Sequence, residues 1–129
     1  MVIAIIGLLS TFLVLALNSA RARSRDAKRV ADIKQVQTAL EMYFNDNNTY
    51  PSSLTFGGAL STSSVVYMAQ LPAAPVPADG GASVCTTDTN AYNYTQEYSG
   101  ASYIINYCLG SNTGDVTAGF HTATPAGIQ

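Results

Sequence analysis

The sequence predicts an α+β protein in which one long N-terminal α-helix carries a small head built on an antiparallel β-sheet. Three observations predict this layout. Residues 1–20 carry no charged side chain, apolar residues then recur at helical spacing as far as Tyr43, and residues 92–109 alternate in character around a glycine turn. We therefore divide the chain into an apolar half-helix (1–20), a basic amphipathic half-helix (21–46) and a head (47–129).

Composition and charge exclude several classes of function. The 129 residues include 6 Lys+Arg, 8 Asp+Glu, one His and two Cys. Only 11% of the chain is charged and 47% is apolar, which argues against intrinsic disorder. The net charge of −2 argues against a general nucleic-acid-binding protein. Because a single His and scattered carboxylates offer little catalytic chemistry, we expect no enzyme, no cofactor and no metal site.

The first 20 residues are apolar on every side and would span about 30 Å as a helix, which is the thickness of a bilayer core. A cleaved signal peptide is the alternative interpretation. Against it, no basic segment precedes the apolar run, and the residues that follow are basic and favour helix. A buried core helix would be polar on one face. We therefore expect a transmembrane helix.

The helix is predicted to continue well beyond the apolar run. No Gly or Pro occurs between residues 18 and 44. One face carries an apolar stripe that would pack on the head, consisting of Ala27, Val30, Ile33, Val36, Leu40 and Tyr43. The polar residues 45–48 should end the helix, and Pro51 prevents it from resuming. The pairs Lys28/Asp32 and Asp26/Arg29 have the spacing of ion pairs along a helix.

The head is predicted to consist of short strands and turns. All five Pro lie in residues 47–129, which favours turns over helix. The alternating runs 92–98 and 103–109 flank a Ser-Gly turn and predict a hairpin. A third strand is expected at 116–121, a short helix or strand at 63–70, and a loop at 71–81.

Two cysteines lie in the head. Cys85 precedes the predicted hairpin and Cys108 lies on its second strand. A small head on a membrane helix points to an oxidising location, in which the two would form a disulfide; two free buried thiols are the alternative. A bridge would stabilise the head by roughly 3 kcal/mol on the chain-entropy model. Zinc would need four ligands, which two Cys and one His cannot supply.

Several segments resemble the type IV pilins and the type II secretion pseudopilins, most strongly the G-type pseudopilin-like branch. The resemblance is specific over residues 1–54 and loose over 65–129. The matching segments are residues 2–10 (VIAIIGLLS), 25–33 (RDAKRVADI), 38–43 (TALEMY), 48–51 (NTYP) and 67–72 (YMAQLP).

The resemblance implies a lollipop fold, with the head on a helix that is held in the inner membrane before assembly. It also implies cleavage by a prepilin peptidase and polymerisation by assembly machinery into a helical homo-oligomer. The family's leader, cleavage glycine and early glutamate do not occur in this sequence, and we expect this chain to be incomplete. The family's filament core would be formed here by Ile3, Ile5, Ile6, Gly7, Leu8, Leu9, Phe12, Leu13, Leu15 and Leu17.

The basic band is expected to make charge contacts. Arg21, Arg25 and Lys28 share a helix face. They would pair with acidic groups of neighbouring subunits, such as Asp46, Asp79 or Asp115, because an unpaired buried charge is costly. Contact with lipid headgroups or solvent is the alternative. Binding of DNA is a minor option, and we expect no nucleic-acid partner.

Three functions remain open from the sequence. The chain would be the subunit of an extracellular type IV pilus-like filament, with a periplasmic pseudopilus of type II secretion as the alternative. A monomeric membrane-anchored binding module is the third. A long filament on the cell surface would separate the first from the second. The third predicts that any apolar helix could replace residues 1–20 without loss of function.

Overall fold

A single helix organises the molecule, of which the computed structural model describes residues 1–81 and 83–129. Helix α1 (Val2–Asn47) has 46 residues and is therefore about 69 Å long. It ends at Asn48, whose backbone is left-handed (φ 55°) and whose N–H donates to the carbonyl oxygen of Phe44 across 2.7 Å. The predicted end at residues 45–48 is confirmed. An asparagine tolerates this conformation better than most residues do.

A four-stranded antiparallel sheet forms the head. It consists of β3 (Asn93–Glu97), β4 (Ser102–Leu109), β5 (Gly119–Thr124) and β6 (Gly127–Ile128), in that order across the sheet. The predicted hairpin is confirmed, and a short 3₁₀ turn (Tyr98–Gly100) joins its strands.

The third strand begins later than predicted. Residues 116–121 were expected to form it, but β5 starts at Gly119, opposite Leu109. The reason is a local turn: Thr113 and Val116 exchange two backbone hydrogen bonds of 2.8 and 3.1 Å. These bonds occupy the backbone of Val116, so pairing with β4 begins only after the turn.

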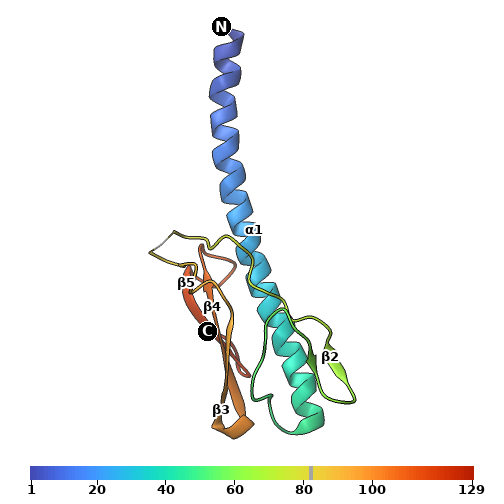
Figure 1. Ribbon diagram of the computed structural model, residues 1–129. Coiled ribbons are helices and arrows are strands. Elements are labelled where there is room, and N and C mark those ends of the chain that lie inside the picture. The colour runs from blue at the N-terminus through green and yellow to red at the C-terminus, as the bar shows by residue number, and fades with distance from the viewer. Residues whose placement is uncertain (82) are drawn as a thin grey trace.

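A second, two-stranded sheet lies against the last turns of α1. Its strands are β1 (Leu60–Ser61) and β2 (Val66–Met68), so the ambiguous segment 63–70 contains a strand. Helix α1 contacts β2 as well as β4 and β5. In Figure 1, β2 lies on one side of α1 and the four-stranded sheet lies on the other. The second half of the helix thus has parts of the head on two sides.

The core lies between α1 and the inner face of the larger sheet. Ile33, Val36 and Leu40 are completely buried, as predicted, while Val30 and Tyr43 are partly buried against the same core. They meet four buried residues of β4, namely Tyr103, Ile105, Tyr107 and Leu109.

The prediction of the apolar stripe is wrong at one residue. Ala27 is exposed. The buried face continues from Ile33 toward the N-terminus through Arg29 and Asp26, which are both completely buried. Ala27 lies about 100° around the helix from Asp26 and therefore points away from the head.

The first half of α1 lies entirely outside the head. Every residue from Met1 to Ala20 is exposed. Figure 1 shows this half extending well beyond the head, with the N-terminus at the far end. It is long and apolar enough to cross a membrane by length and composition. The coarse prediction of an α+β chain with one long apolar helix and small antiparallel sheets is confirmed.

Candidate functional site

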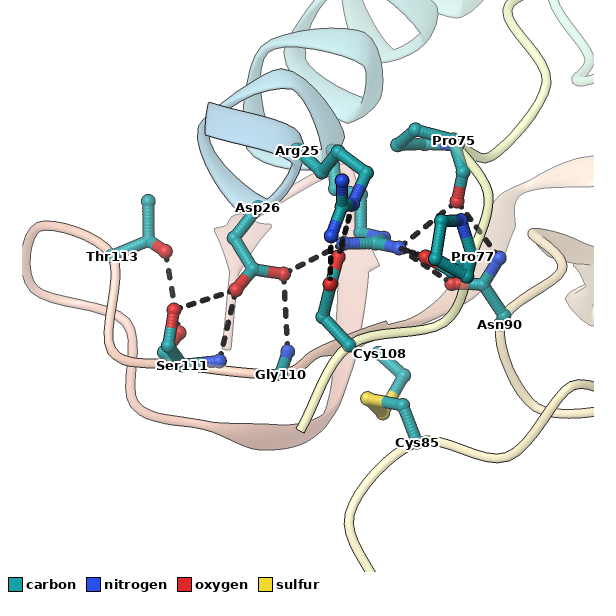
Figure 2. A network of polar contacts seen from close by, with 12 residues as sticks. Arg25, Asp26, Pro75, Pro77, Cys85, Asn90, Cys108, Gly110, Ser111 and Thr113 are labelled. Atoms are coloured by element: carbon teal, nitrogen blue, oxygen red, sulfur yellow. Dashed lines mark hydrogen bonds and ion pairs between the residues drawn. A yellow bond between two sulfur atoms is a disulfide. The ribbon is translucent and has the colours of Figure 1, made fainter. Parts of the chain in front are cut away.

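Two parts of α1 are candidates for function. The first is the exposed apolar half-helix, residues 1–20. The second is a cluster of charged side chains where α1 enters the head, which we call the polar junction. It consists of Arg25, Asp26, Arg29, Asp79 and Asn90, together with the backbone groups that they bind (Figure 2).

Asp26 holds the loop that follows β4. Its Oδ1 accepts the backbone N–H of Gly110 at 3.0 Å, and its Oδ2 accepts the N–H and the hydroxyl of Ser111 at 2.9 and 2.6 Å. The carboxylate is completely buried. Figure 2 shows it pointing from the helix into the turn formed by Gly110 and Ser111. A buried carboxylate needs such donors, because each replaces a lost contact with water.

Arg29 is the centre of the polar junction. Its Nη1 donates to Oδ1 of Asp26 at 2.8 Å and to Oδ2 of Asp79 at 2.9 Å. The guanidinium is also completely buried. One cation thus bridges a carboxylate on its own helix and a carboxylate 50 residues later in the chain.

The other terminal nitrogen of Arg29 binds the loop before β3. Nη2 donates to the carbonyl oxygens of Pro75 and Pro77 at 2.9 and 3.2 Å, and to Oδ1 of Asn90 at 2.8 Å. Asn90 in turn donates from Nδ2 to the carbonyl of Pro75 at 3.0 Å. The planar, forked guanidinium can satisfy several acceptors in fixed directions, which an ammonium group cannot.

Arg25 completes the junction at its solvent edge. Nε and Nη2 donate to the two oxygens of Asp79 at 2.8 and 2.5 Å, which is a bidentate ion pair. Burial alone would raise the pKa of Asp79, but the hydrogen bonds from Arg25 and Arg29 outweigh it and hold that pKa below its ordinary value. The same hydrogen bond raises the pKa of Arg25. Both groups therefore remain charged.

A second ion pair lies one turn further along the helix. Lys28 Nζ and Asp32 Oδ2 are 2.6 Å apart, and the Tyr92 hydroxyl donates to the same oxygen at 3.1 Å. The two pairs predicted from helical spacing, Lys28/Asp32 and Asp26/Arg29, are both confirmed. Burial, followed by the nearby Asp32 carboxylate, raises the pKa of Tyr92, so its hydroxyl stays a donor.

The predicted disulfide is confirmed beside the polar junction. Cys85 and Cys108 are bonded, with their Cα atoms 5.9 Å apart. The bond ties the segment before β3 to the end of β4, two residues before Gly110. Figure 2 shows it next to the polar network. The loops that bind Asp26 and Arg29 are therefore held covalently as well as by hydrogen bonds.

The predicted charge contacts with neighbouring subunits stay a prediction, but the reason given for two of the residues does not hold. Arg25 and Lys28 have acidic partners in their own chain, so they do not require partners from another subunit. Asp79 is one of those internal partners. Arg21 is exposed. Asp46 is also exposed, and its Oδ2 accepts the Tyr67 hydroxyl at 3.0 Å.

The predicted filament-core residues are all exposed. Gly7 lies among them with nothing close to the position that a Cβ would occupy. The other exposed side chains of this set are Ile3, Ile5, Ile6, Leu8, Leu9, Phe12, Leu13, Leu15 and Leu17.

The polar junction itself was not predicted. The sequence predicts Asp26 and Arg29 only as an ion pair along the helix, and Asp79 as a possible partner for a neighbouring subunit. One signal was available: Asp26, Arg29, Ile33, Val36 and Leu40 follow one another at steps of three and four, so the two charges lie on the buried face. No sequence signal identified Asn90 or the backbone acceptors.

No family model, curated protein or solved structure matches this chain. Within residues 1–81 and 83–129, no group of three or more His, Cys, Asp or Glu side chains is placed to hold a metal ion. The candidate site thus consists of an exposed apolar half-helix and the polar junction that joins it to a small head.

Proposed function

We propose that this chain is a structural subunit that polymerises through residues 1–20 of α1 into a type IV pilus-like filament. The observation that carries the proposal is the contrast between the two halves of one unbroken helix. Residues 1–20 are apolar and wholly exposed, whereas the second half buries one face against a head whose core is already closed. The head leaves the first half uncovered, so lipid or other helices must cover it.

The two environments correspond to two stages of assembly. Before assembly, the apolar half-helix lies in the inner membrane, whose hydrocarbon core it matches in length. In the filament, the same side chains lie against the helices of other copies. This transfer exchanges lipid contacts for protein contacts, so the gain comes from close packing of side chains. Gly7 permits two helices to approach closely, because it has no side chain.

The polar junction gives the head a fixed orientation on the helix. Arg29 binds the loop that precedes β3 and Asp26 binds the loop that follows β4, and the disulfide ties the segment before β3 to the end of β4. A head that turned freely on its helix would not repeat the same contacts in every subunit of a helical polymer. In this proposal the protein is not an enzyme; its charged residues hold the subunit in shape.

The proposal is tested by reordering residues 3–17 so that their composition is kept but their faces are changed. If the chain is a filament subunit, the reordered variant no longer polymerises, because packing between helices is specific. It still inserts into the membrane, because its composition is unchanged. Recovery of the chain in the sheared surface fraction should fall, with its amount in the membrane fraction unchanged. The control is Thr87→Ala, at an exposed position in the head. Equal recovery of the reordered and control variants would support a monomeric anchored module.

A further inference from the structure

The last turns of α1 form a groove with β2 on the face of the helix that is turned away from the larger sheet. Met42, Asn45, Asp46, Val65, Val66 and Tyr67 line this groove, which has a volume of about 290 Å³. Met42 lies nine residues after the buried Ile33, which is about 180° around the helix. Figure 1 shows β2 on the side of α1 opposite β4 and β5.

The groove combines exposed apolar side chains with one carboxylate. Met42, Val65 and Val66 are 48, 44 and 63% exposed. Tyr67 is fixed against Tyr43, with their ring centroids 5.1 Å apart, and its hydroxyl donates to Oδ2 of Asp46. This contact holds the carboxylate at the edge of the groove. Within the described part of the chain, no basic side chain forms an ion pair with Asp46.

The chain also carries basic side chains that its own acids do not neutralise. Arg25, Lys28 and Arg29 take part in ion pairs, whereas Arg21, Arg23 and Lys34 are exposed and form none within residues 1–81 and 83–129. Arg23 lies among small and polar residues just after the apolar half-helix. It is about 80° around the helix from Ile33 and therefore lies on the flank of the helix, between the face on the larger sheet and the opposite face.

We propose that this groove receives the segment around Arg23 of a neighbouring copy of this chain, with Arg23 paired to Asp46. The inference rests on the proposed function. In a filament whose heads face outward, the groove faces inward, and the exposed flank around Arg23 of another copy, just after its apolar half-helix, packs against it. Arg23 and Asp46 are 23 residues apart on a straight helix, so the two copies are displaced along the filament by about 35 Å.

The test uses the full chain in the cells that assemble it, with cysteine pairs introduced at exposed positions. Arg23→Cys combined with Val66→Cys should give a ladder of cross-linked multimers from sheared filaments after mild oxidation. The matched control combines Arg23→Cys with Thr38→Cys, which is exposed on α1 but corresponds to a displacement of only about 22 Å. Each single variant controls for symmetric cross-links, and Cys85–Cys108 remains as the internal disulfide.

A charge exchange gives an independent measurement. Asp46→Arg should place an arginine against Arg23 and reduce filament recovery roughly tenfold, because like charges repel across an interface. Combining it with Arg23→Asp should restore recovery. Both residues are exposed, so neither belongs to the closed core. Asp46→Arg also removes the acceptor of the Tyr67 hydroxyl, but the combined variant loses it equally, so restored recovery reports the charge contact alone.

The possible outcomes separate this inference from the proposed function. Filaments that give no ladder with the Val66 pair, or that give it with the Thr38 pair instead, overturn the contact and leave the polymer intact. If Arg23→Asp fails to restore filament recovery in the Asp46→Arg variant, the contact is likewise overturned and the polymer is not. Absence of filaments from the unmodified chain overturns the proposed function and this contact together.

Discussion

Arg29 Nη1 donates to Asp26 Oδ1 across 2.8 Å, one helical turn away, and the side chains are only 1% and 0% exposed. An exposed pair at this spacing stabilises a helix by a few tenths of a kcal/mol. Burial changes the consequence of losing one partner, because the remaining charge is left without water or a counter-ion. This pair is therefore the point at which the head depends most on a single side chain of the helix.

Replacing Arg29 should destabilise the head severely. Arg29→Met leaves the buried carboxylate of Asp26 uncompensated and removes the donor to Pro75, Pro77 and Asn90. We expect the free energy of unfolding to fall by about 3–5 kcal/mol, measured by urea denaturation of the full chain in detergent. Arg23→Met, at an exposed position of the same helix, should stay within about 0.5 kcal/mol. Similar losses in both variants would contradict the role assigned to the junction.

Acid should weaken the junction through Asp79. Its pKa is held below the ordinary value of 3.8, so the folded state favours the carboxylate and its stabilising effect is complete above that pH. The effect is lost as the pH falls from 3.8 through the lower pKa of the folded state. We expect Asp79→Asn to be less stable than the unmodified chain at neutral pH. The difference should shrink below pH 3.8, and a gap in urea midpoints that stays constant over this range would argue against it.

Gly110 should not tolerate a side chain. A Cβ at this position would lie against the backbone and Cβ of Asp79 and within 2.5 Å of the nitrogen of Gly80. Two loops of the polar junction cross here, and the N–H of Gly110 donates to Asp26. Gly110→Ala should therefore separate the loops and lower the midpoint of thermal unfolding. Gly7→Ala, which has open space around it, is the control and should leave unfolding of the head unchanged.

The disulfide should contribute measurably to the head. Cys85 and Cys108 are separated by 23 residues, and closing a loop of that size stabilises a fold by roughly 3 kcal/mol on the chain-entropy model. The double variant Cys85→Ser, Cys108→Ser should lose about that amount. Reductant should lower the stability of the unmodified chain and leave the double variant unaffected. A reductant effect on both would show that its action does not depend on this bond.

Much of the fold could be predicted from the sequence, because the residue patterns of the long helix and of the hairpin are periodic. The stripe through Ile33, Val36 and Leu40 and the alternation along residues 103–109 identify which faces are buried, and burial confirms them. The start of β5 was missed by three residues, because the turn closed by Thr113 and Val116 depends on backbone hydrogen bonds that no residue pattern announces.

The polar junction could not be predicted in the same way. Its members come from the helix, from the loops around Asp79 and Asn90, and from the turn at Gly110. No local spacing relates these segments, and two of the acceptors are carbonyl groups of prolines, which any residue could provide. What the sequence did contain was the position of Asp26 and Arg29 on the buried face.

The most direct measurement is electron microscopy of the sheared surface fraction of cells that express this chain, with mass spectrometry of the same sample. We predict filaments that reach micrometre length, composed mainly of this chain, with residues 1–20 retained in the polymer. Confinement of the chain to the membrane fraction, with no filaments under conditions in which it is abundant, would contradict it.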